Sequence, residues 1–150
     1  MMFSRRTFVQ SFAGLLALSA AGMQSISAEE HEEKKPMGKL VFEVEGRKFT
    51  ATLADNAATR KLVTMLPLTL EFEDLYGREF CHRFAQALPT DDVQYRGYEI
   101  GEIVYWPPRH SFVILYEQNG EAFDMQSIGR IDSLKDLPSG NFTATLSLQK

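Results

Sequence analysis

The sequence contains very little cysteine, since Cys81 is the only one among its 150 residues. A single cysteine excludes an internal disulfide, even in an oxidising compartment. We expect Cys81 to be a small buried thiol, with an intermolecular bridge as the alternative.

The sequence also lacks the motifs of the common catalytic sites. It contains no Gly-x-Ser-x-Gly elbow, no phosphate-binding Walker loop and no dinucleotide fingerprint. Its three histidines, His31, His82 and His110, do not have the spacing of zinc ligands. Cys81 and His82 are neighbours in the chain, so on a strand they would point to opposite faces and could not form a catalytic pair. We therefore expect no metal and no cofactor, and the sequence names no reaction.

Clusters of basic residues are absent as well. The chain has 16 Lys and Arg against 20 Asp and Glu, a net charge of −4. Nucleic-acid binding depends on neutralising phosphates, and docking on anionic lipid depends on basic segments. The composition therefore argues against nucleic acid and against an anionic membrane surface as partners.

Long apolar runs are missing too. The longest N-terminal run, residues 12–23, is shorter than the ~20 residues that a membrane-spanning helix needs. Arg5 and Arg6 precede this run, and the small residues Ser27 and Ala28 follow it. This order is typical of a signal peptide. We predict one over residues 1–28, cleaved after Ala28 or, alternatively, after Ser27.

The start of this segment resembles a twin-arginine export signal. The stretch "SRRTFVQ" has Arg5 and Arg6 followed by Phe8, while Gln10 replaces the usual lysine. The resemblance implies the twin-arginine machinery and signal peptidase as partners. The mature protein would then lie in the periplasm or outside the cell, free of the membrane. A general secretory signal that happens to carry two arginines is the alternative.

The mature chain has the length of one domain. Residues 29–38 begin with "EEHEEKKP", which mixes charges and has no apolar residue, so we predict a disordered leader there. Residues 39–150 form the predicted domain.

Alternating apolar residues dominate this domain and predict strands. Residues 40–53 read as a hairpin that turns at Gly46, and a helix follows, capped by Asp55 or Asn56 and closed by Pro67. Further strands are expected at 68–75, 100–106, 112–118, 122–131 and 141–149, with a helical turn after Ser133.

This pattern predicts a mainly β fold, a closed β-barrel of about seven to eight strands with one helix after the first hairpin and a short helical turn near the C-terminus. A two-layer sandwich is the competing architecture. A barrel of this size is filled by its own side chains, so a site would lie on an outer face or at a rim. The expected filling is Phe42, Phe49, Leu53, Phe72, Val104, Val113, Leu115, Ile128 and Phe142.

Several segments together resemble the bacterial cyclophilin-like family of small domains. They are "DNAATRKLVTMLPLTLEFEDLYGRE", "LPTDD", "GEIVYWPPRHSFVILYEQ" and "IGRID", in the family's order. The resemblance implies a cyclophilin-type β-barrel. It implies little about activity, because most members have no known function.

True cyclophilins are peptidyl-prolyl isomerases, and their hallmark is Phe-His-Arg-Val-Ile-Pro with a catalytic arginine. Here the stretch "FCHRF" inserts Cys81, and no Val-Ile-Pro follows. Arg83 is therefore only a weak catalytic candidate, since a fold does not carry an activity without its site.

The stretch "YWPPRH" supplies the candidate ligand contacts Tyr105, Trp106, Arg109 and His110. Two prolines stiffen the connection between two strands. An aromatic ring beside Arg and His suits an anionic or aromatic small molecule or a peptide end. The alternative is a rigid turn whose tryptophan seals one end of the barrel.

Arg130 is a further candidate. Gly129 before it suggests a bulge or a close backbone approach. Arg130 would pair with Asp132, with Asp124 or with an acid elsewhere in the chain, or face a ligand beside Trp106.

Together these residues favour an exported, non-catalytic module that binds a small molecule or peptide. A prolyl isomerase and a structural or protein-interaction module are the alternatives.

Overall fold

The computed structural model describes residues 35–150. The predicted export signal, with Arg5, Arg6, Phe8 and the cleavage site at Ala28, lies outside the described residues, as does most of the predicted leader. None of the helices in residues 35–150 is long and apolar enough to cross a membrane.

Strands make up most of the described chain. The elements, in chain order, are β1 (Gly38–Val44), β2 (Arg47–Leu53), α2 (Ala57–Met65), β3 (Leu68–Leu75), β4 (Glu79–Arg83), β5 (Gln94–Arg96), β6 (Glu102–Trp106), the 3₁₀ turn η1 (Pro107–Arg109), β7 (Ser111–Leu115), β8 (Phe123–Ile131), the 3₁₀ turn η2 (Leu134–Asp136) and β9 (Phe142–Leu148).

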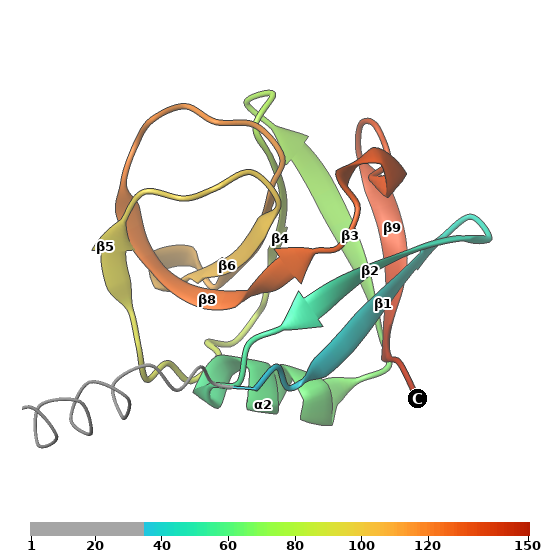
Figure 1. Ribbon diagram of the computed structural model, residues 1–150, viewed down its shortest axis with the longest axis horizontal. Helices are drawn as coiled ribbons and strands as arrows, with labels where there is room; N and C mark the ends of the chain where they lie inside the picture. Colours follow the sequence, from blue (N-terminus) through green and yellow to red (C-terminus); the bar gives the residue numbers. More distant parts are fainter. Residues whose placement is uncertain (1–34) are drawn as a thin grey trace, which may run out of the picture. The chain divides into compact units, whose positions relative to one another are not determined.

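The strands form a closed antiparallel barrel (Figure 1). Their order is β2-β1-β9-β3-β4-β7-β6-β8, and pairing of β2 with β8 closes the ring of eight. The short strand β5 lies outside this ring and pairs with β8. The structure thus confirms the predicted barrel, and the sandwich alternative is wrong.

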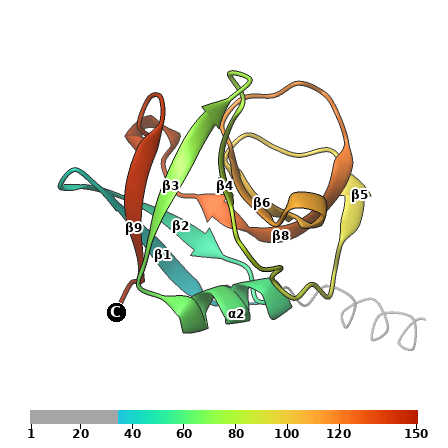
Figure 2. The ribbon, with the colours of Figure 1, turned by 180° about the vertical axis from the view of Figure 1, so that it is seen from behind.

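Helix α2 covers one end of the barrel (Figure 2). Of the two predicted caps, Asn56 is the one used: its side chain accepts the Thr59 N–H at 3.0 Å, and Thr59 Oγ1 accepts the Asn56 N–H at 3.0 Å. The Asn56 amide also donates to the Ser127 carbonyl at 2.7 Å, which ties the helix to β8. Ala58 and Leu62 are fully buried in the barrel core. Hydrogen bonds to two backbone N–H groups at its N-terminus and burial of one apolar face therefore fix this helix in place.

Aromatic rings fill much of the barrel interior. Phe42 stacks on Phe49 with 4.5 Å between ring centroids, and Phe72 stacks on Phe142 at 5.0 Å. Such pairs add to the area that they remove from water. Of the predicted filling, Leu53 and Ile128 join these four rings inside.

Val104, Val113 and Leu115 were expected inside, and this is wrong. They are buried in a second cluster with Cys81, Tyr98 and Met125 on the outer face of β4, β6, β7 and β8. The segments around Tyr98 and Phe123 cover that face, so these strands are buried on both sides. A strand with two buried faces is apolar throughout, and its inner residues cannot be told from its outer ones by alternation.

The structure confirms the special role predicted for Gly129. The pairing of β6 with β8 shifts register between Ile103 and Val104, which marks a bulge. A Cβ at Gly129 would lie 2.2 Å from the Thr52 carbonyl oxygen. Only glycine fits at this crossing of three strands.

Candidate functional site

The connection between β6 and β7 is held in one shape. Pro107 begins η1, and the His110 N–H donates to the Pro107 carbonyl at 3.2 Å. His110 has a φ of 49°, and its carbonyl accepts the Phe84 N–H at 2.9 Å. The turn is therefore fixed both internally and to the residue that follows β4.

Tyr105 and Trp106 are neighbours that point to opposite faces of the barrel wall. Tyr105 lies inside, fully buried, and its hydroxyl accepts the Leu88 N–H at 3.0 Å. Tyr105 is therefore a core residue. This corrects the expectation that it would contact a ligand.

Trp106 shares the outer face of β6 with Val104 and is half-buried. It belongs to neither buried cluster and packs against neither. Helix α2, through residues such as Leu62, covers the barrel end instead. Trp106 is thus placed as an outer-surface ring and not as a seal inside the barrel.

Arg83, Ser111 and Trp106 form a row across three strands. Arg83 of β4 pairs with Ser111 of β7, and Ser111 pairs with Trp106 of β6. Directly paired residues share a face, and neighbouring strands are about 4.8 Å apart. The weak catalytic candidate and the tryptophan therefore lie on the same outer face, with one buried serine between them.

Cys81 lies two residues before Arg83 on the same face. Burial raises the pKa of its thiol, although a hydrogen bond with Ser111 acts in the other direction. The Ser111 hydroxyl also donates to the Arg109 carbonyl at 3.1 Å. A protonated, buried thiol is a poor nucleophile. We therefore assign Cys81 a packing role in the buried cluster beneath this face.

The charges around this row are unbalanced. Arg83 and Arg109 are exposed, and neither makes an ion pair with another residue of the described chain. Of the acids on this face, Glu73 lies on β3 opposite Cys81, while Glu79 of β4 and Glu102 of β6 are already paired with Arg78 and Arg96. Arg83 and Trp106 share this face, and the turn between β6 and β7 adds the exposed Arg109 and the half-buried His110. We call Arg83, Trp106, Arg109 and His110 the outer-face site.

His82, the other part of the "His-Arg" pair, does not join this site. Its Nδ1 lies 2.9 Å from the Glu71 carbonyl oxygen, and its ring packs against Phe72 and Phe84. Among the described residues, no three His, Cys, Asp or Glu side chains are grouped so that they could hold a metal ion. His31 lies outside these residues.

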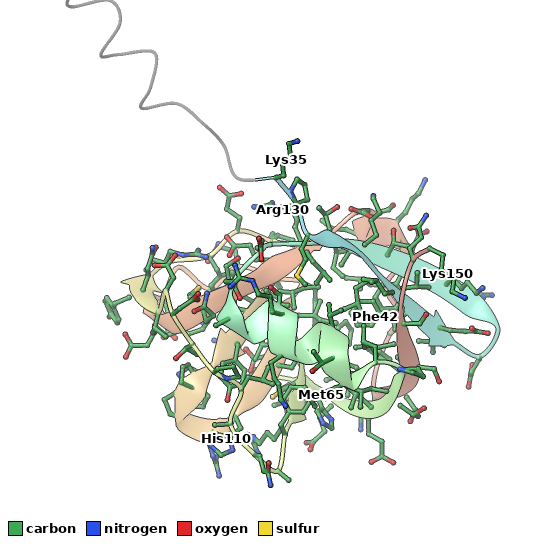
Figure 3. The ribbon with its side chains drawn as sticks, turned by 90° about the horizontal axis from the view of Figure 1, so that it is seen from below. Lys35, Phe42, Met65, His110, Arg130 and Lys150 are labelled. Carbon is green, nitrogen blue, oxygen red and sulfur yellow. The ribbon has the colours of Figure 1, made fainter. Side chains whose placement is uncertain are left out.

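Arg130 lies away from the outer-face site. Arg130 of β8 pairs with Glu102, which begins β6, whereas Trp106 ends that strand. Figure 3 shows Arg130 and His110 at opposite edges of the molecule. Its guanidinium pairs with Glu99 at 2.8 Å, and not with Asp132 or Asp124. The structure therefore does not place Arg130 beside Trp106.

Sequence reasoning missed two hollows at the end of the barrel away from α2. The smaller, of about 300 Å³, is lined by Asp74, Phe80, Tyr116, Leu134, Leu137, Pro138 and Ser139. The larger, of about 810 Å³, is lined by Val44, Glu45, Arg47, Lys48, Phe49, Lys135, Asp136, Leu137, Pro138 and Ser139. No local pattern signals them, because their walls come from separate parts of the chain.

Two comparisons with known proteins bear on this fold, and a third found nothing. The model of the cyclophilin-like family matches residues 42–147. The solution structure of the hypothetical protein AF2241 from Archaeoglobus fulgidus superposes with a TM-score of 0.59 at 13% sequence identity, covering 79% of this chain and 100% of that one. This likeness concerns the fold alone. No curated protein sequence matches the chain significantly.

Proposed function

The chain belongs to the cyclophilin-like family, and on that premise we propose that it is an exported domain that binds carboxylates on the outer face of its barrel without transforming them. The carboxylate would be carried by a small molecule or by the end of a peptide. The outer-face site would hold it.

One observation carries this proposal. Arg83 and Trp106 lie on one outer face with Ser111 between them, and Arg83 and Arg109 pair with no acid of the described chain. A guanidinium is a planar fork of donors that matches a carboxylate. The half-buried indole of Trp106 offers part of its apolar face to the group that bears the carboxylate. These side chains are thus suited to an acid with an apolar neighbour.

The proposal can be tested by calorimetry with the full chain. The ligands are acetyl-Ala-Ala-Pro with a free carboxylate and the same peptide with a C-terminal amide. We expect the acid to bind and the amide to bind at least ~10-fold more weakly, because the amide loses a charge-assisted pair worth ~1.5–3 kcal/mol. Arg83→Ala and Arg109→Ala should each weaken binding of the acid by a similar factor.

Arg60→Ala is the matched control. Arg60 is an exposed arginine of α2 whose guanidinium is already paired with Asp55 at 2.8 Å, so it is not part of the outer-face site. Its removal should leave the affinity unchanged. Equal binding of acid and amide, or equal losses in all three arginine variants, would refute a carboxylate site at Arg83 and Arg109.

A prolyl isomerase is the second candidate. Arg83 favours it, because this residue lies on the outer face of a cyclophilin-like barrel within two strands of an aromatic ring. It predicts turnover of a proline-containing peptide that disappears in Arg83→Ala. Binding of the peptide acid without any turnover at high protein concentration would reject it.

Export is proposed from the N-terminal segment. The order of Arg5, Arg6 and Phe8 before an apolar run supports a twin-arginine signal cleaved after Ala28. Replacing both arginines by lysine keeps the charge but removes the motif, so the precursor should accumulate inside the cell. Normal export of this double variant would instead support the general secretory route.

A further inference from the structure

The end of the barrel away from α2 is covered by residues 132–141. This segment begins where Asp132 accepts hydrogen bonds from Lys39 at 2.8 Å, Thr50 at 2.6 Å and Thr52 at 2.7 Å. It then forms the single turn η2 and returns to β9. Leu137 is the residue of this segment that packs, half-buried, against the barrel core.

One helical turn cannot fill the mouth of a barrel. The two hollows lie against the same three residues, Leu137, Pro138 and Ser139. Their volumes, about 300 and 810 Å³, lie within the range of ~300–1,000 Å³ that is typical of small-molecule sites. The covering segment thus leaves adjoining space on its two sides.

The smaller hollow combines apolar walls with a polar edge. Phe80, Leu134 and Leu137 line it, with the hydrogen-bonded pair Tyr116 and Asp74 at its edge. The Tyr116 hydroxyl donates to the Asp74 carboxylate at 2.5 Å. This bond and burial raise the pKa of Tyr116 to about 12, so the phenol stays neutral. This hollow suits a ring or short chain and offers no cation.

The larger hollow supplies the cations. Arg47, Lys48 and Lys135 line it, and the carboxylates on its walls are Glu45 and Asp136. None of the three cations makes an ion pair within residues 35–150. In a chain with a net charge of −4, a hollow lined by more basic than acidic side chains is a local exception.

We propose that this end of the barrel is a second ligand site, which takes a small amphipathic carboxylate. The apolar part lies in the smaller hollow, and the carboxylate reaches past Ser139 to the cations of the larger hollow. This site is separate from the outer-face site, because β7 runs from Ser111 beside Trp106 to Leu115, next to Tyr116 at the hollow. Neither proposal depends on the other.

The test is a ¹⁹F NMR titration of the full chain with 3-(4-fluorophenyl)propionate. The matched probe is 3-(4-fluorophenyl)propan-1-ol, which has the same apolar part and no charge. We expect the acid to bind and the alcohol to bind ~10-fold more weakly, since one charged contact is lost. Lys135→Glu should weaken binding of the acid by ~3- to 10-fold, because a like charge replaces an opposite one.

Ser139→Phe tests the position of the ligand. Ser139 is exposed and borders both hollows, so a larger side chain can fill them while the protein stays folded, which circular dichroism will verify. We expect Ser139→Phe to abolish binding of the fluorinated acid and Arg83→Ala to leave that binding unchanged.

Unchanged binding in Ser139→Phe, or equal affinities for acid and alcohol, would overturn the proposal. If Arg83→Ala lost the acid and Ser139→Phe kept it, the ligand would lie on the outer-face site. That result would reject the second site and support the proposed function, so the two failures are distinguishable.

Discussion

The two ends of this barrel are closed by different means. At one end α2 has nine residues, a capping box at Asn56, and Ala58 and Leu62 fully buried in the core. At the other end residues 132–141 contribute one 3₁₀ turn and the half-buried Leu137, and two hollows remain. A regular amphipathic helix can fill a barrel mouth, whereas an irregular segment of similar length leaves room for a ligand.

The difference also separates the two proposed sites. Near the α2 end the interior is taken up by core residues such as Tyr105, so binding groups can lie only outside, as Trp106 and Arg83 do. At the other end the space itself is available. Variants at the two ends should therefore behave differently.

The largest contrast is expected between Leu62→Ala and Leu137→Ala. Leu62 is fully buried under α2, so its truncation should lower the free energy of unfolding by about 2–5 kcal/mol. Leu137 already borders both hollows, so its truncation should cost about 1 kcal/mol. Urea unfolding of both variants measures these losses. Equal losses would show that the two ends are packed equally well.

Asp132→Ala should have the next largest effect. Its carboxylate ties the covering segment to β1 and β2, and its side chain is 26% exposed. Loss of hydrogen bonds to a charged group should cost about 2 kcal/mol at pH 7. If the Asp132→Ala variant were as stable as wild type, the covering segment would be held by Leu137 instead.

The same carboxylate gives a pH dependence with a definite sign. Burial acts to raise the pKa of Asp132, but hydrogen bonds from Lys39, Thr50 and Thr52 lower it below its ordinary value. A lowered folded-state pKa stabilises the protein above the unfolded-state pKa, and this contribution is lost as the pH falls through the folded-state pKa. The difference in stability between wild type and Asp132→Asn should therefore shrink on acidification below pH ~4. A difference that grew with acid would contradict this.

Asp74→Asn should have the smallest effect on stability and a clear one on titration. Without the carboxylate, the pKa of Tyr116 should fall from about 12 toward the ordinary value of 10.0. Because the fold favours the protonated phenol, the pair stabilises wild type below pH 10 and loses this contribution as the pH rises toward 12. NMR titration of the Tyr116 ring carbons checks the shift, with Tyr116→Phe identifying the signal. An unchanged pKa would mean that burial, and not Asp74, is the cause.

Much of the fold could be predicted because its signals are local. The alternation in residues 40–53, the cap at Asn56 and the stop at Pro67 depend on neighbouring residues, and the structure agrees with each. Gly129 was marked as a special position, although its reason, the nearby Thr52 carbonyl, lies on another strand.

The side of each strand on which residues lie was harder to predict. The apolar run of β7 is buried throughout, so nothing in it distinguishes Val113 outside from Ile114 inside. The same difficulty led Tyr105 to be grouped with Trp106. Alternation puts these neighbours on opposite faces, but only the pairing of Tyr105 with the core residue Phe112 shows that Tyr105 is the inner one.

The site could be predicted only in part. The turn around Trp106 is visible in the sequence, but the pairing that puts Arg83 on the same face joins residues far apart in the chain. The sequence allowed Arg130 to pair with an acid elsewhere in the chain but could not identify it as Glu99, which comes from another segment.

The central claim is that Trp106 forms part of a binding surface outside the barrel. Trp106 is the only tryptophan of the chain, so its fluorescence reports on this surface alone. The decisive measurement is the emission maximum and acrylamide quenching of the full chain, with and without acetyl-Ala-Ala-Pro acid. We predict red-shifted emission that acrylamide quenches readily and that the peptide acid, but not its amide, protects. Blue-shifted emission that neither acrylamide nor the peptide changes would mean that Trp106 is packed away, and the outer-face site would be wrong.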